Sequence, residues 1–116
     1  MHNNYDSIDV KGLLRVRMEE KIEKLGEPYV LNGITLKGLF HDLDADAMRA
    51  YLDDPSIARM VGSGVFMVTP ADAEVKTGDC LSRIRVGGQY RALKVTVQRV
   101  GGSEIAKNVV LVRVPA

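Results

Sequence analysis

The residues of this chain best suited to binding a metal ion are a group of aspartates after residue 40. Asp42, Asp44 and Asp46 alternate along the chain, and Asp53 follows eleven positions after the first. This spacing is similar to that of a calcium-binding loop, which needs oxygen ligands on alternate residues. Such a loop also needs a glycine at its sixth position, where this chain has Ala47, and it ends in a bidentate glutamate rather than an aspartate. We therefore interpret the aspartates as solvated carboxylates near the start of a helix, where the helix dipole favours them, and we expect no metal.

The candidates for nucleophilic chemistry are equally few. The chain has one cysteine, Cys80, and two histidines, His2 and His41, and none of them has the spacing of a metal-ligand pair. A reactive cysteine needs a base and a setting that stabilises its thiolate, whereas Cys80 stands at a strand start and is interpreted as a small buried apolar residue. The Gly-Ser-Gly segment 62–64 lacks the further glycines of a hydrolase elbow or a dinucleotide-binding loop, so we interpret it as a hinge. We expect no catalytic residue, no cofactor and no enzyme; an unrecognised site at Cys80 or the aspartates is one alternative.

Basic residues in the second half of the chain are suited to binding phosphate groups. We expect them on the solvent-facing sides of neighbouring strands, as a basic strip made of Arg83, Arg85, Arg91, Lys94 and Arg99. Modules that bind single-stranded nucleic acid present several stacking aromatics, but only Tyr90 lies among these cations. A formal net charge of +1 also gives no strong attraction to nucleic acid. A solvated basic face is therefore favoured, and a small nucleic-acid-binding β-barrel is the main alternative function.

Length and composition favour one domain spanning residues 1–116. The chain has 116 residues, of which 46% are hydrophobic, and this is enough for one buried core. A single cysteine allows no internal disulfide, and the first residues lack the charged start and apolar run of a secretory signal, so we expect a reducing, cytoplasmic compartment. Charges interrupt every apolar run well before the roughly 20 residues needed to cross a bilayer, so we expect no membrane partner.

One strong helix pattern is present, over residues 7–25. Its apolar residues recur every three or four positions and form one stripe, made of Val10, Leu14, Met18, Ile22 and Leu25. Gly26 is expected to stop the helix in a left-handed conformation, and Pro28 prevents its continuation.

A β-hairpin and then a long connection are expected after this helix. Asn32 and Gly33 tolerate the positive φ angles of a type I′ turn, and Gly38 is expected to mark a β-bulge. Residues 41–64 differ in composition from the segments around them and are interpreted as a long mobile loop, with a short helix from about Asp44 to Asp53.

Residues 65–114 are expected to form a β core. Apolar and polar residues alternate over 81–86 and 93–98, and glycine pairs supply tight turns at 87–88 and 101–102. In 81–86 the pattern places Ile84 and Val86 on one face and Arg83 and Arg85 on the other. The last strand, 108–114, is apolar on both faces and needs a second cover, which is the N-terminal helix, a barrel interior or another subunit. We therefore predict a mainly β fold with one N-terminal α-helix: a small antiparallel β-barrel or sandwich of about five to seven strands with a long loop.

Three features also follow one another in a characteristic order. Gly38–Asp42 combines glycine, apolar residues, phenylalanine and an acid before the long loop, and Val75–Leu81 combines an apolar residue, a basic turn and a Gly-Asp-x-Leu strand start. Tyr90 and the closing strands come next. This order resembles the head-tail joining proteins of long-tailed bacteriophages, the lambda-type head completion or connector proteins.

The resemblance implies a structural virion protein without enzymatic activity, present in the virion and, during assembly, in the host cytoplasm. It implies a hexameric ring of identical subunits that binds head or connector proteins and tail proteins. DNA would pass through the channel of this ring.

Three sets of residues are our candidates for protein contacts. The long loop supplies Asp44, Met48, Tyr51, Leu52, Ile57 and Met60. The basic strip supplies Arg83, Arg85 and Arg91, and the last strand supplies Val110 and Val112. We expect deletion of residues 44–60 to leave the fold intact and to abolish assembly.

Overall fold

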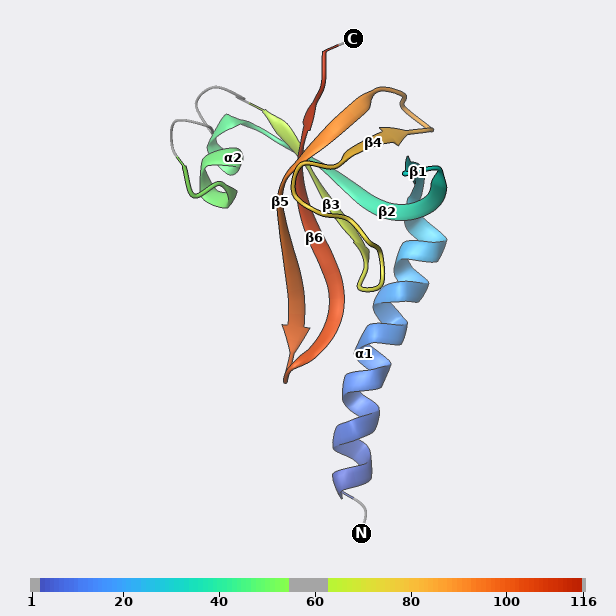
Figure 1. Ribbon diagram of the computed structural model, residues 1–116. Coiled ribbons are helices and arrows are strands. Elements are labelled where there is room, and N and C mark those ends of the chain that lie inside the picture. The colour runs from blue at the N-terminus through green and yellow to red at the C-terminus, as the bar shows by residue number, and fades with distance from the viewer. Residues whose placement is uncertain (1–2, 55–62, 116) are drawn as a thin grey trace.

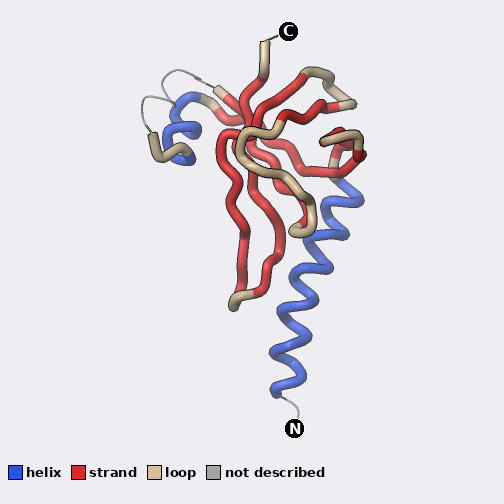
Figure 2. The backbone as a smooth tube through the Cα atoms, viewed as in Figure 1, coloured by secondary structure: helices blue, strands red, loops and turns tan. Residues whose placement is uncertain are grey.

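The computed structural model of the protein describes residues 3–54 and 63–115, with side chains of the first helix described from residue 12 onward. The described elements follow one another as α1 (Asn3–Leu25), β1 (Glu27–Leu31), β2 (Ile34–Leu43), α2 (Ala45–Tyr51), β3 (Gly64–Pro70), β4 (Cys80–Arg83), β5 (Gln89–Val100) and β6 (Ser103–Arg113). The strands form a closed antiparallel barrel in the order β1-β2-β3-β6-β5-β4 (Figures 1 and 2). The predicted mainly β fold with an N-terminal helix is confirmed, as a barrel rather than a sandwich.

The molecule is elongated, because its longest elements run side by side. The β5–β6 hairpin extends away from the other strands, and α1 runs along it (Figure 1). The overall dimensions are 58 × 30 × 20 Å. The chain termini therefore lie at opposite ends of the long axis in this view.

Helix α1 begins at Asn3, before the predicted residue 7, and ends at Leu25 as predicted. Of its apolar stripe, Ile22 is fully buried, whereas Leu14 and Leu25 remain exposed. The stop does not use a left-handed glycine, because Gly26 is absent from the residues with positive φ. Glycine is needed there for space, since a Cβ on Gly26 would collide with the carbonyl oxygen of Ile22. Among the described residues of the stripe, Ile22 is therefore the one that this chain covers completely, and Met18 is partly covered.

The first hairpin has the predicted turn but a longer second strand. Asn32 and Gly33 have φ angles of 53° and 79°, which fit a type I′ turn. Gly38 forms no bulge and pairs in register with Glu27; a Cβ there would lie only 2.8 Å from Cγ of Met67. The predicted loop 41–64 begins later than expected, because residues 41–43 belong to β2 and pair with β3.

Tyr29 is the largest side chain that is fully buried in the barrel. Its hydroxyl lies 2.7 Å from Oγ1 of Thr69, which itself donates to the carbonyl oxygen of Lys37 at 2.9 Å. Since the Thr69 proton is used in this way, the Tyr29 hydroxyl is the donor to Thr69. Burial raises the pKa of Tyr29 above its usual value of 10.0.

Tyr29→Phe is expected to destabilise the fold by about 1 to 2 kcal/mol at neutral pH, because one buried hydrogen bond is lost. A raised folded-state pKa means that the unfolded chain releases its proton first. The contribution of Tyr29 is therefore complete below about pH 10 and is lost as the pH rises beyond it. Urea unfolding of both proteins between pH 7 and 11 should show their stability difference shrinking in the alkaline range. A difference that stays constant over this range would contradict the burial of a neutral Tyr29 hydroxyl.

The last strand, β6, is apolar on both faces for two separate reasons. Val109 and Leu111 point into the barrel core, while Val110 is buried on the outside against Leu43 and Met48. Met48 belongs to α2, so the second cover comes from a helix that the prediction did not consider for this role. The short helix itself, predicted near residues 44–53, is confirmed as α2.

Candidate interaction surface

Helix α2 has a capped start and packs on the outside of the barrel through two side chains. Asp44 caps its start, accepting a hydrogen bond from the backbone N–H of Ala47 at 2.8 Å. Met48 is buried, and the Tyr51 ring packs on Phe66 of β3 with ring centroids 5.0 Å apart. Of the residues predicted to contact partners, Met48 therefore holds this segment against its own barrel, and Asp44 stabilises the start of the helix. Tyr51 remains partly available, since its side chain is exposed.

The remaining candidates around α2 are also engaged within the chain. Leu52 and Val112 pack beside the buried Val110. After the helix, Lys94 of β5 donates to the carbonyl oxygen of Tyr51 at 3.0 Å and lies 3.3 Å from a carboxylate oxygen of Asp53. Deletion of residues 44–60 would uncover this apolar surface, so we no longer expect it to leave the fold intact. Ile57 and Met60 lie outside the described residues.

Arg83 faces the barrel interior, contrary to its predicted place on a solvent-facing basic strip. Its side chain is only 8% exposed, and Nη2 donates to Glu27 Oε1 at 3.0 Å and Oε2 at 3.2 Å. The guanidinium carbon lies 4.2 Å from the centroid of the Phe40 ring and 5.5 Å from that of Tyr90. The cause is the phase of β4, in which the buried Leu81 and Arg83 alternate inward.

The strand also ends earlier than predicted. β4 stops at Arg83, so Ile84 and Val86 lie in the turn before Gly87 and Gly88 instead of on an inward face. The two glycines have positive φ angles of 77° and 93°, as a tight reversal requires. The side chains of Ile84 and Val86 are consequently 53% and 59% exposed.

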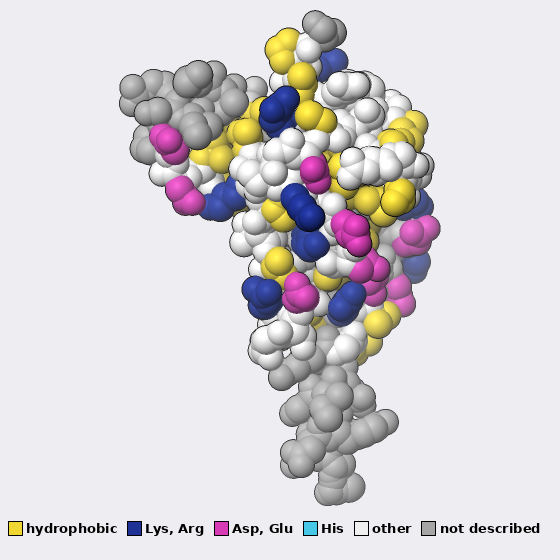
Figure 3. All heavy atoms as spheres, viewed as in Figure 1, with side chains coloured by type: hydrophobic (Ala, Val, Ile, Leu, Met, Phe, Trp, Pro, Cys, Tyr) yellow, Lys and Arg dark blue, Asp and Glu magenta, His cyan; other side chains and the backbone are white. Residues whose placement is uncertain are grey.

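The other basic residues do not form one continuous strip. Lys94 pairs with α2 as described, and Arg99 lies 3.8 Å from Glu104 on the next strand. Arg85 and Arg91 are exposed. Basic and acidic side chains are interspersed over the face seen in Figure 3. The predicted phosphate-binding surface is thus reduced to separate cations.

The aspartates do not converge either. Asp44 is a helix cap, Asp46 lies 3.2 Å from Arg49, and Asp53 lies beside Lys94. Among the residues that the structure describes, no three His, Cys, Asp or Glu side chains form a group suited to a metal ion.

Cys80 is exposed, contrary to its predicted burial. Cys80 occupies an outward-facing position of β4, directly opposite the exposed Arg91 of β5. One equivalent of a thiol reagent such as DTNB should therefore react with the folded protein at a rate within about tenfold of that for the unfolded chain, because no opening reaction is needed. A Cys80→Ser variant is the blank. Protection by a factor of about 1,000, as expected when reaction requires global unfolding, would contradict this exposure.

Sequence reasoning missed the apolar residues on the outer side of α1. Leu13 and Val16 are each 47% exposed. They lie off the stripe of Leu14, Met18 and Ile22. A second apolar pair on the same helix is the sequence signal that could have indicated a second apolar face. Beside the helix, a groove between α1 and the end of the β5–β6 hairpin is lined by apolar residues including Leu14, Met18, Val100 and Ile105.

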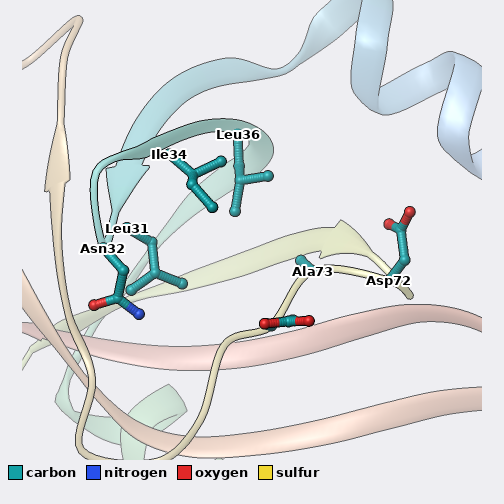
Figure 4. A pocket seen from close by; sticks show the side chains of 7 residues that line it. Leu31, Asn32, Ile34, Leu36, Asp72 and Ala73 are labelled. Atoms are coloured by element: carbon teal, nitrogen blue, oxygen red, sulfur yellow. The ribbon is translucent and has the colours of Figure 1, made fainter.

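A pocket of roughly 330 Å³ opens beside the β1–β2 hairpin. Leu31, Ile34 and Leu36 supply its apolar side, and Asp72 and Ala73, which follow β3, lie across from them (Figure 4). Glu74 also lines it.

Comparisons of the chain with family models, curated proteins and solved structures find no match. Within the described residues, neither helix has the length and apolar content needed to cross a bilayer.

Proposed function

We propose that this protein is a structural subunit that joins head and tail in a long-tailed bacteriophage or prophage, as a member of an oligomeric ring at the connector. The supporting observation is the outer face of α1. This face presents Leu13 and Val16 to solvent, and among the α1 side chains that the structure describes the first fully buried one is Ile22. Helices in proteins gain most of their stability from packing an apolar face, so a neighbouring subunit or partner protein is the natural cover.

The chemistry of the described residues agrees with an assembly role. Asp44, Asp46 and Asp53 are dispersed into a helix cap and two ion pairs instead of being directed into one cleft. Fixed apolar surfaces and charged turns suit a protein that positions other proteins. Within this proposal the subunits act in the virion and meet their partners in the host cytoplasm during assembly.

A small nucleic-acid-binding barrel is the second candidate, favoured by the exposed Arg85 and Arg91. It receives less support, because Arg83 and Tyr90 are buried and Lys94 is paired with Asp53. Salt-dependent binding of DNA by the purified protein at physiological ionic strength would favour it over the assembly role.

The experiment for the assembly role changes Leu13 and Val16 together to aspartate. Because both side chains are half exposed, the thermal unfolding of the isolated protein should change little. The yield of joined particles should fall by about 100-fold or more, since each tenfold loss requires only about 1.4 kcal/mol and burying an unpaired carboxylate costs several kcal/mol. Thr96→Asp, at an exposed position of β5, is the control and should assemble normally. Normal particle yield from the double variant would contradict the role given to this face.

A further inference from the structure

Two surface features of the barrel have complementary shape and charge. The first is an apolar knob, which we define as Ile84, Arg85 and Val86 in the β4–β5 turn. The second is an acid-rimmed pocket, defined as the roughly 330 Å³ cavity lined by Leu31, Ile34, Leu36, Asp72, Ala73 and Glu74. Neither feature is used by the contacts described above.

The knob is unusual for a turn, because turns favour Gly, Asn, Asp, Ser and Pro. Two β-branched apolar side chains, Ile84 and Val86, stand more than half exposed on either side of Arg85. No ion-pair partner of Arg85 is found in the described part of the chain. A surface that buries both apolar side chains and offers carboxylates to the guanidinium would stabilise all three residues.

The pocket offers those properties. Its apolar wall includes Ile34, which is 61% exposed although it belongs to a barrel strand. Asp72 and Glu74 place carboxylates at the rim, and the described residues provide no cation to either. An apolar segment carrying one cation would therefore match the pocket in both polarity and charge.

The knob and the pocket lie at opposite ends of β1. The knob joins the start of this strand, where the Ile84 N–H donates to the carbonyl oxygen of Pro28 at 3.3 Å. The pocket lies at the other end, beside Leu31 and the Asn32–Gly33 turn. Since the knob does not fill the pocket of its own chain, the two are distinct surfaces, as a head-to-tail contact between identical subunits requires.

We propose that the apolar knob of one copy docks in the acid-rimmed pocket of the next copy, with Arg85 facing Asp72 and Glu74. This inference builds on the proposed ring and names the contact that repeats around it. Every subunit then gives one knob and receives one, and a closed ring leaves neither surface free.

Single-cysteine cross-linking tests this contact even where it is weak. In a Cys80→Ser background, Ile34→Cys and Val86→Cys proteins are mixed at about 1 mM, a concentration at which contacts with millimolar Kd are populated, and treated with a short bismaleimide. The mixture should give a cross-linked dimer that neither protein gives alone. A chain carrying both substitutions should give a ladder of oligomers. The matched control pairs Thr96→Cys with Val86→Cys and should give only background.

A charge exchange between separate chains tests the rim. Arg85→Glu on the Val86→Cys protein should lower the cross-linked yield at least severalfold, and Asp72→Arg with Glu74→Arg on the Ile34→Cys protein should restore it. Misfolding of one chain cannot produce this rescue. Cross-linking no greater than in the Thr96→Cys control, or a yield insensitive to the exchange, would overturn the docking.

The outcome is separable from that of the proposed function. Specific cross-linking together with normal head-tail joining by the Leu13 and Val16 variant would keep the docking and remove the support for the assembly role. Loss of head-tail joining by that variant, without specific cross-linking, would keep the assembly role and overturn the docking.

Discussion

Glu27→Ala is expected to lower the free energy of unfolding by about 3 kcal/mol, because it leaves the Arg83 guanidinium buried without a counter-ion. Arg83 is 8% exposed and Glu27 is 20% exposed, so water can replace the lost carboxylate only partly. The Phe40 ring, 4.2 Å away, offers a cation–π contact but no hydrogen-bond acceptor of comparable strength. The Nε of Arg83 already has no hydrogen-bond partner, and removal of Glu27 would add further unpaired donors.

Urea denaturation of the single and double variants measures this effect. Arg83→Met with Glu27→Leu replaces both charged side chains by apolar ones and should recover most of the lost stability. The recovery would show that the cost arises from the isolated charge rather than from lost packing. A Glu27→Ala protein within about 0.5 kcal/mol of the parent, as surface substitutions usually are, would contradict the buried ion pair.

Gly64→Ala is expected to destabilise the protein by about 2 kcal/mol, the usual scale of overpacking a tightly packed site. A Cβ at this position would lie 2.6 Å from Sδ of Met48 and 2.7 Å from the backbone oxygen of Leu111. Met48 can move, but Leu111 is fixed in the β3–β6 ladder. The methyl group would therefore push α2 away from the barrel and uncover Val110.

Gly12→Ala adds the same methyl group at a position of α1 with nothing within 4 Å. It should stabilise the helix by about 0.5 to 1 kcal/mol. In thermal unfolding, the Tm of Gly64→Ala should be lower than that of the parent protein, and the Tm of Gly12→Ala should be higher. A neutral or stabilising Gly64→Ala would mean that α2 does not pack over this glycine.

Features with local causes were predictable from the sequence. The Asn32–Gly33 turn follows from the positive φ angles that these residues tolerate. The end of α1 at Leu25 was also placed correctly from Gly26 and Pro28, although Gly26 does not adopt the left-handed conformation that the prediction assumed. The two-sided apolar character of β6 correctly predicted that a second cover exists. The barrel follows from short strands separated by glycine turns.

Features that depend on distant residues were not predictable. Whether Arg83 or Ile84 faces inward depends on where β4 ends and on Glu27, which stands 56 positions earlier and supplies the counter-ion. Because the inward and outward positions of β4 were predicted one residue out of phase, Cys80 was also predicted to be buried, whereas it is exposed. Likewise, Met48 was assigned to a mobile loop, because nothing near it in the sequence shows that Val110 lies beneath it.

Electron microscopy of particles made by the encoding phage or prophage, with and without this gene, tests the proposed function most directly. Without the gene, filled heads and complete tails should accumulate separately, and a supplied copy of the chain should restore joined particles with added density between them. Joined, infectious particles in the absence of the protein would contradict a role at the head-tail connection.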